Sequence, residues 1–213
     1  MTGLASWHRD FPDLLAGSVY AAPGSRVAAA QTLAEAGIDV HVDVMAVSEG
    51  LPVGVSLAEL QMISTSVDRS RIGVHLIGSA DFVDAVLPKI LAQHPGVVFL
   101  PWHAFTDERV RAIRAAGAAA WIAVWREWDG LAQPGWSADP DGVLVMLIEP
   151  GTRDRCRLDR LGLVTACTTR FTDLPVAVDG GVTREVAPLC VTAGVRQMIV
   201  GRALMTSERR EAM

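Results

Sequence analysis

The chain has 213 residues, half of them hydrophobic, and a formal net charge of −5 at pH 7. This length suits one α/β domain at the short end of the barrel range, and an acidic chain without a basic stripe excludes a nucleic-acid partner. Because no apolar run reaches the roughly 18 residues that a membrane span needs, no membrane association is expected either.

Residues 1–213 are expected to form a single domain, preceded by a short extension over about residues 1–16. This extension lacks the basic start and the apolar stretch of a signal peptide. Its Trp7, Phe11 and Leu14, with Leu15, could instead pack against the domain. The three cysteines match no zinc spacing, and idle thiols together with the missing signal favour a cytoplasmic location.

Lysine chemistry is almost excluded by composition, because Lys89 is the only lysine against eighteen arginines. Schiff-base aldolases and pyridoxal-phosphate enzymes need a lysine amine at the reacting centre. Lys89 follows Pro88 within a helical pattern, far from any predicted strand end. An aldolase or decarboxylase that depends on such a lysine is therefore set aside.

Short apolar runs alternate with amphipathic stretches along the chain. The runs predict strands buried on both faces at Ser18–Ala21, Val40–Val44, Ile72–Leu76, Val97–Leu100, Ala119–Val124, Val143–Ile148, Val176–Val178 and Met198–Val200. Helical spacing predicts helices at Ser25–Ala36, Ala80–Gln93, Thr106–Ala116 and Thr183–Ala193, the last with a Thr cap. Residues 125–141, rich in Trp, Gly, Pro and Asp, predict an irregular loop. Such alternation is typical of a barrel or a doubly wound sheet.

Polar side chains that could take part in metal binding or catalysis lie where these strands end. His41 and Asp43 are two residues apart in one apolar strand, so they share a face. His75 ends the next strand, and Asp179 ends the seventh, before two glycines. Each has a structural interpretation when taken alone: a satisfied pair in the core, a structural histidine and a turn aspartate.

Together these four residues predict a divalent metal site. In a barrel, the carboxyl ends of the strands form the active face. Two imidazoles and two carboxylates suit zinc first, with iron, cobalt or manganese as alternatives. The carboxylates of Asp43 and Asp179 could flank a substrate, so that one removes a proton and the other returns one. A metal would polarise the adjacent carbonyl.

At this point the sequence resembles the ribulose-phosphate 3-epimerase family. The matching stretches, in the family's order from about Ser18 to Met205, are His41–Met45, Val74–Leu76, Val145–Met146 with Pro150–Gly151, Val178–Val182, and Ala193–Gly194 with Gly201. The resemblance implies a single (β/α)8 TIM barrel of the ribulose-phosphate-binding type. It implies metal ligation by His41, Asp43, His75 and Asp179, and acid/base roles for the two aspartates.

The resemblance also implies a set of substrate contacts. They fall on Ser18, Met45, Met146, Gly151, Gly180, Gly181, Gly201 and Arg202. The two methionines also have an ordinary explanation as core residues. The implied ligand is a small sugar phosphate or related polyol, and the family commonly forms homo-oligomers.

The parts that would bind the substrate's distal end depart from the family. Its Asn-Pro-Gly-Phe-Gly-Gly-Gln loop is Glu149–Arg155 here, with only Pro-Gly kept, and its Gly-Ser after the eighth strand is Gly201-Arg202. Losing glycines weakens a backbone phosphate cradle. Arg153, Arg155 or Arg202 could supply charge instead, although the first two are also typical of an exposed helix start.

The leading hypothesis is a metal-dependent epimerase that inverts a carbon beside the carbonyl of a ketose phosphate through an enediolate. The resemblance implies ribulose 5-phosphate and xylulose 5-phosphate as the default pair. Two alternatives remain: an epimerase of another sugar-like substrate in a specialised pathway, and an inactive barrel that serves as a binding partner. The tryptophans Trp102, Trp125, Trp128 and Trp136 could line the mouth, form a subunit contact or pack in the core.

Overall fold

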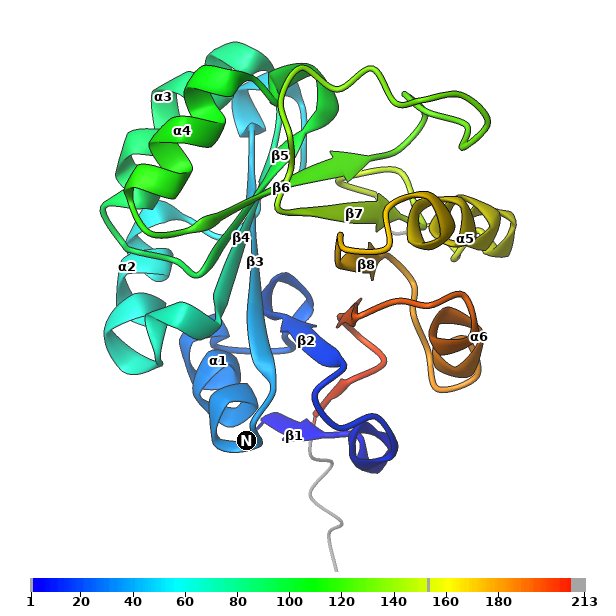
Figure 1. Cartoon of the computed structure of the whole chain (residues 1–213). Coiled ribbons are helices and arrows are strands. Elements are labelled where there is room, and N and C mark those ends of the chain that lie inside the picture. The colour runs from blue at the N-terminus through cyan, green and yellow to red at the C-terminus, as the bar shows by residue number, and fades with distance from the viewer. Residues whose placement is uncertain (1, 153, 208–213) are drawn as a thin grey trace, which may run out of the picture.

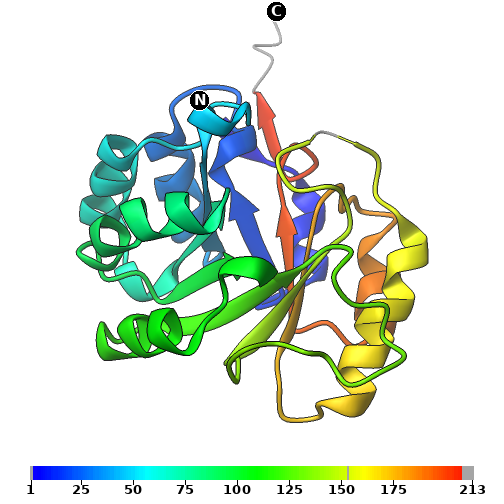
Figure 2. The same cartoon turned by 90° about the horizontal axis from the view of Figure 1, so that it is seen from above.

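A closed barrel of eight parallel strands organises the computed structural model, which describes residues 2–152 and 154–207. The strands follow chain order around the barrel: β2 (Leu15–Ser18), β3 (Asp39–Met45), β4 (Ile72–Ile77), β5 (Val97–Pro101), β6 (Ala119–Val124), β7 (Gly142–Met146), β8 (Val176–Asp179) and β9 (Gln197–Val200). Figures 1 and 2 show the helices ringed around these strands. The predicted (β/α)8 TIM barrel is confirmed.

The connections between strands carry the helices. They are α1 (Arg26–Glu35), α2 (Leu57–Ser66), α3 (Ala80–Leu91), α4 (Asp107–Ala115), α5 (Leu161–Arg170) and α6 (Ala187–Thr192). Short 3-10 turns lie at η1 (Ser6–Asp10), η2 (Val19–Ala21), η3 (Val47–Glu49), η4 (Arg69–Arg71), η5 (Trp102–Ala104) and η6 (Leu158–Arg160). None of the helices in the described part of the chain combines the length and apolar character needed to cross a bilayer.

Two aromatic rings are the largest side chains in the core inside the barrel. Phe99 and Trp121 point inward from β5 and β6, and their ring centroids lie 5.5 Å apart. Glycines on the neighbouring strands make room for them: a Cβ at Gly142 would lie 2.4 Å from the Trp121 ring, and one at Gly73 2.9 Å from Phe99. The barrel is therefore a packed core below its mouth, and only the carboxyl ends of the strands remain open to a ligand.

The first barrel strand begins earlier than predicted. The sequence placed it at Ser18–Ala21, but β2 is Leu15–Ser18 and Val19–Ala21 form the 3-10 turn η2. Within β2, a Cβ at Gly17 would lie 2.3 Å from the side chain of Leu33, so the missing side chain lets the strand pack closely against α1. The shift makes Ser18 the last strand residue and shortens the extension before the barrel.

Most of the predicted helices overlap a helix of the structure, but their first residues do not always agree. Ser25 and Thr106 cap α1 and α4 with their side chains, as expected of such residues. The stretch predicted at Thr183–Ala193 is helical only over α6, Ala187–Thr192. Thr183 does not cap it; its hydroxyl donates to Glu185 instead. Pro188 lies in the first turn of α6, where the fixed φ of proline favours helix initiation.

Tryptophans replace a helix between β6 and β7. Residues 125–141 contain no helix or strand, as the composition predicted. Trp136 packs 5.1 Å from Phe171 at the end of α5, measured between ring centroids, and Trp128 lies 6.1 Å from the same ring. Trp102 joins this cluster at 6.3 Å from Trp136. Trp128 is buried in the core, and Trp102 and Trp136 pack against it while partly buried, so these three rings cover the barrel where a helix would otherwise lie.

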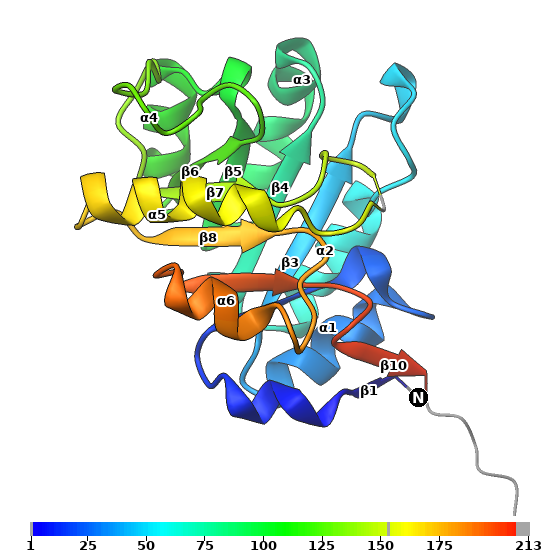
Figure 3. The same cartoon turned by 90° about the vertical axis from the view of Figure 1, so that its right-hand side faces the viewer.

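The two ends of the described chain meet outside the barrel. β1 (Thr2–Leu4) pairs antiparallel with β10 (Met205–Ser207), which Figure 3 shows beside α1. The indole of Trp7 donates a 3.0 Å hydrogen bond to the carbonyl of Ala203, and its ring packs on Phe11. Between residues 201 and 207 the chain passes from β9 to β10 through a turn and forms no helix.

Candidate active site

Four ionisable side chains converge at the carboxyl ends of three strands. His41 and Asp43 alternate with valines on β3 and point into the barrel, and His75 on β4 pairs in register with Asp43. Asp179 ends β8, which two strands, β2 and β9, separate from β3. One ligand atom from each residue lies within 4.8 Å of the other three. The barrel thus brings together all four residues predicted to hold a metal.

These side chains are held in place by one another and by a serine. Asp43 Oδ1 lies 3.1 Å from His41 Nε2, and Asp43 Oδ2 accepts a 2.8 Å hydrogen bond from the hydroxyl of Ser18. Phe99 packs beneath both imidazoles, with ring centroids 5.3 Å from His41 and 6.1 Å from His75. The Ser18 contact fixes the Asp43 carboxylate, and Phe99 limits rotation of the two rings.

Burial and mutual charge shift the pKa of each carboxyl in a different direction. Burial opposes ionisation of Asp43, but the facing His41 and His75 rings outweigh it and hold the pKa of Asp43 well below its usual range. Burial raises the pKa of Asp179 to about 6, and the neighbouring Asp43 carboxylate adds to this shift. For His41, burial lowers the pKa, but the Asp43 carboxylate more than compensates and the pKa is raised.

The donor set fits a divalent cation. His41 and His75 are each 1% exposed and Asp43 is 5% exposed, while Asp179 is partly exposed, so three of the four polar groups are almost completely removed from water. His75 Nδ1 is buried and has no hydrogen-bond partner among the described residues, although Asp43 Oδ1 lies 3.5 Å away and Asp179 Oδ2 3.9 Å away. A buried nitrogen left without a partner is costly unless something binds it. Neutral imidazole and carboxylate oxygens are the ligands that zinc and related metals prefer.

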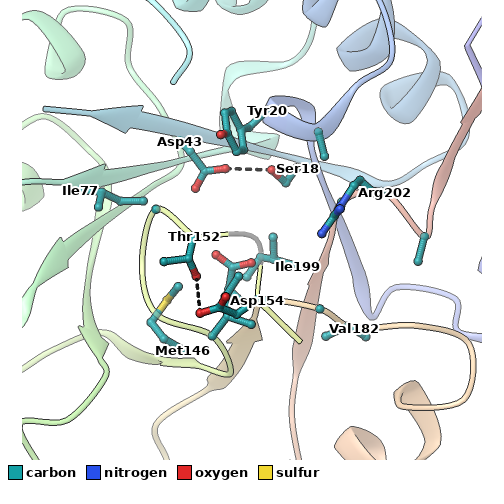
Figure 4. A pocket seen from close by; sticks show the side chains of 18 of the residues that line it. Ser18, Tyr20, Asp43, Ile77, Met146, Thr152, Asp154, Val182, Ile199 and Arg202 are labelled. Carbon is teal, nitrogen blue, oxygen red and sulfur yellow. Dashed lines mark hydrogen bonds between the residues drawn. The ribbon is translucent and has the colours of Figure 1, made fainter. Parts of the chain in front are cut away.

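A cavity of about 500 Å³ opens above this cluster. Figure 4 shows Ser18 and Asp43 on one side of it and Thr152, Asp154 and Arg202 around the rest. All eight residues predicted to contact substrate line its wall: Ser18, Met45, Met146, Gly151, Gly180, Gly181, Gly201 and Arg202. His41 and His75 lie behind the wall, and Asp43 and Asp179 reach it. The cavity is therefore continuous with the cluster through its two carboxylates.

Other wall residues escaped the sequence analysis. Tyr20 lines the cavity from η2, and Ile148 and Asp154 line it from the segment after β7. Their positions in the sequence could have indicated this, because loops that follow the carboxyl ends of barrel strands form the active face. Glu149, the first residue of the altered loop, is exposed and is not among the residues that line the cavity, and Arg153 lies outside the described residues.

Fold and site together define a barrel with a candidate metal centre at its carboxyl face. The chain belongs to the ribulose-phosphate 3-epimerase family, whose model matches residues 14–205. This agrees with the motifs around His41, His75 and Asp179.

Solved structures of other barrels match over most of the chain. Tryptophan synthase from Mycobacterium tuberculosis has a TM-score of 0.63 at 20% identity, covering 93% of this chain and 86% of that one. Phosphoribosyl anthranilate isomerase from Thermotoga maritima has a TM-score of 0.62 at 14% identity, with 89% and 88% covered. Orotidine 5′-monophosphate decarboxylase from Sulfolobus solfataricus has 0.54 at 14% identity, with 88% and 87% covered. At these identities the likeness concerns the fold alone.

Proposed function

We propose that this protein is a metal-dependent epimerase that inverts a carbon next to the carbonyl of a ketose phosphate or of another sugar-like substrate. One observation carries the proposal: His41, Asp43, His75 and Asp179 offer ligand atoms within 4.8 Å of one another at the floor of an open cavity. Membership of an epimerase family supports the same reaction class.

The four residues would hold one divalent ion, with zinc as the first candidate and iron, cobalt or manganese as alternatives. Such an ion supplies Lewis acidity: it polarises a carbonyl and stabilises the negative charge that develops on its oxygen. The unpartnered Nδ1 of His75 is the strongest sign in this chain that a ligand bond is intended.

The two aspartates would move the proton. Asp43 stands on β3 and Asp179 on β8, with β2 and β9 between them, so a substrate above these strands meets carboxylates from two sides. One carboxylate takes the proton from the carbon beside the carbonyl, which leaves an enediolate of the substrate. The other carboxyl group, which enters the turnover protonated, donates its proton to the opposite face, so each turnover exchanges the protonation states of the two aspartates. The hydrogen bond from Ser18 would hold the Asp43 carboxylate in one orientation for this transfer.

Apolar side chains would keep water away from this exchange. Met45, Ile77, Met146 and Ile199 line the cavity around the two carboxylates. An enediolate protonates from any available donor, so a site that excludes water directs the proton to one face. These apolar side chains would thus leave Asp43 and Asp179 as the proton donors and acceptors nearest to the substrate.

A sugar-phosphate substrate fits the family, and ribulose 5-phosphate with xylulose 5-phosphate is the first pair to test. The altered segment after β7 keeps a second candidate open, a sugar-like substrate of a specialised pathway. We further propose that residues 1–213 act as one domain, as a homo-oligomer and in the cytoplasm; the free thiols of Cys156, Cys167 and Cys190 support the reducing compartment. Light scattering after gel filtration measures the oligomeric state.

Solvent exchange tests the reaction whatever group the substrate carries at its distal end. Metal-loaded protein is incubated in deuterium oxide with a panel of ketopentoses and ketohexoses, each with and without a terminal phosphate. We expect deuterium to enter the carbon next to the carbonyl of at least one of them. Protein that takes up no divalent ion and exchanges no proton on any member of the panel would instead be the inactive binding barrel.

A further inference from the structure

Among the described residues that line the cavity, only Tyr20 carries an aromatic ring. It belongs to η2, is partly buried and follows Ser18 by two residues. The hydroxyl of Ser18 donates to Asp43 Oδ2, and Figure 4 shows the Tyr20 ring on the same side of the cavity as these two side chains. A substrate held at Asp43 therefore comes within reach of the Tyr20 ring.

The aliphatic hydroxyls of the wall are used within the protein. Three described residues carry them, and each donates its one proton over 2.7–2.8 Å: Ser18 to Asp43, Thr152 to the Glu149 carbonyl and Thr183 to Glu185. Outside the metal cluster, the other side-chain donors among the described wall residues are the guanidinium of Arg202 and the phenol of Tyr20. A guanidinium matches an anion such as a phosphate, whereas a phenol suits a neutral hydroxyl.

A phenol is matched to a carbon chain that carries hydroxyls. Its ring offers an apolar surface to C–H groups, and its oxygen has one proton and two lone pairs. Tyr20 can therefore bond a substrate hydroxyl in addition to a partner within the protein. A site that hydrogen-bonds a substrate hydroxyl binds an analogue without it less tightly, because that bond is missing.

Arg26 contacts the ring from α1 and is not among the residues that line the cavity. Its guanidinium carbon lies 5.8 Å from the centroid of the Tyr20 ring, and its Nη1 donates a 2.8 Å hydrogen bond to the carbonyl of Gly54. Gly54 packs on β3, where a Cβ would lie 2.6 Å from the backbone oxygen of Asp43. Arg26 thus links the Tyr20 ring to the end of the strand that carries Asp43.

We propose that the phenol of Tyr20 hydrogen-bonds a hydroxyl of a ketose phosphate and so selects substrates that carry this hydroxyl, with Arg26 as the positioning residue that fixes the ring. In a 2-ketopentose 5-phosphate, the oxygens on carbons 2 and 3 belong to the enediolate, which leaves the hydroxyls on carbons 1 and 4. This inference rests on the proposed function for the ketose at the metal end. It adds the residue that distinguishes one ketose phosphate from another.

Polyol phosphates test the Tyr20 contact without chemistry, because they lack the carbonyl and cannot react. Calorimetry on the metal-loaded protein compares ribitol 5-phosphate with its 1-deoxy and 4-deoxy forms. One deoxy form should bind about tenfold more weakly than the parent, and Tyr20→Phe should shrink this difference to about twofold or less. Thr183→Ala removes a wall hydroxyl whose proton goes to Glu185, so it should keep the full difference.

Combined variants test the positioning role of Arg26. Arg26→Gln should reduce the preference for the parent polyol over the deoxy form, and Arg26→Lys, which keeps a cation at the ring, should retain most of it. In the Tyr20→Phe background, Arg26→Gln should change nothing further, because no phenol oxygen remains to be positioned. Equal losses in the two backgrounds would refute this role of Arg26.

A preference that Tyr20→Phe leaves unchanged would overturn the proposal, and so would equal binding of all three polyols or failure of ribitol 5-phosphate to bind. These outcomes are separate from those of the exchange experiment. Exchange on a ketose phosphate, with an unchanged preference in Tyr20→Phe, would refute the Tyr20 contact and uphold the epimerase. A preference lost in Tyr20→Phe, in a protein that exchanges no proton, would do the reverse.

Discussion

The metal end of the cavity, formed by His41, Asp43, His75 and Asp179, is built differently from its loop wall of Thr152, Asp154, Gly201 and Arg202, which we call the handle end. At the metal end, His41, Asp43 and His75 stand on strands in the barrel, are almost wholly buried and contact one another. At the handle end, Asp154 and Arg202 stand on loops and are exposed. Strand positions fix geometry, and loops tolerate change. The comparison suggests that the reaction is set by the barrel and the choice of substrate by the loops that follow it.

Removing either proposed acid/base group should have the largest effect. Asp43→Asn and Asp179→Asn keep the shape of the side chain but cannot move the proton, so deuterium exchange should fall by about 10²–10⁴-fold. Asp173→Asn, an exposed residue outside the cavity wall, is the matched control and should keep full exchange. If both site variants stay within tenfold of the unaltered protein, the metal end is not where the chemistry occurs.

Removing one imidazole should release the metal. His75→Ala deletes a proposed ligand, and we expect affinity for zinc to drop by more than about 100-fold, since even partners outside the ligand set contribute 10–100-fold. Metal content after dialysis measures this, with circular dichroism to confirm the fold. His103→Ala, on η5 after β5 and outside the cavity wall, should bind as before. Equal metal content in the two variants would argue for a purely structural His75.

Acid should weaken metal binding, because protons and the ion compete for the same atoms. Burial raises the pKa of Asp179 to about 6, so without metal this carboxyl is mostly ionised above pH 6 and mostly protonated below it. Affinity should fall as pH drops through 6, by about tenfold per unit for each displaced proton, and the raised pKa of His41 adds a second competing proton that already acts above this pH. Titrations between pH 5 and 7.5 measure it. A flat profile would mean that Asp179 is not a ligand.

The smallest effect at the metal end should come from its supporting serine. Ser18→Ala removes the 2.8 Å hydrogen bond to Asp43 Oδ2 without touching the proposed ligands. Metal affinity or exchange should fall by about tenfold, at the lower end of what such partners contribute. Thr183→Ala provides a control, because this cavity residue directs its hydroxyl to Glu185 instead. A loss as large as that of Asp43→Asn would make Ser18 itself a catalytic residue.

The sequence predicted what the strands carry, because strand periodicity places alternate residues on one face. His41 and Asp43 share a face for that reason, and the barrel rule then brings His75 and Asp179 to the same mouth. Strand β2 was misplaced by three residues because the packing of Gly17 against Leu33 is a tertiary contact that leaves no local pattern. The metal end could thus be predicted almost completely.

The handle end could not, because loop conformation depends on contacts between distant segments. Asp154 lines the cavity and Glu149 does not because of how the segment after β7 folds, with its Cys156 packed against Gly181 after β8. The role of the tryptophans is similar: Trp128 and Trp136 cover the barrel only because Phe171 at the end of α5 meets them. No spacing in the sequence specifies these contacts.

An anomalous-scattering map of crystals grown with zinc tests the central claim most directly. The account predicts one peak about 2.0–2.2 Å from His41 Nε2, from His75 Nδ1 and from an oxygen of both Asp43 and Asp179. A map with no peak among these four side chains, whether or not zinc binds elsewhere on the protein, would contradict it.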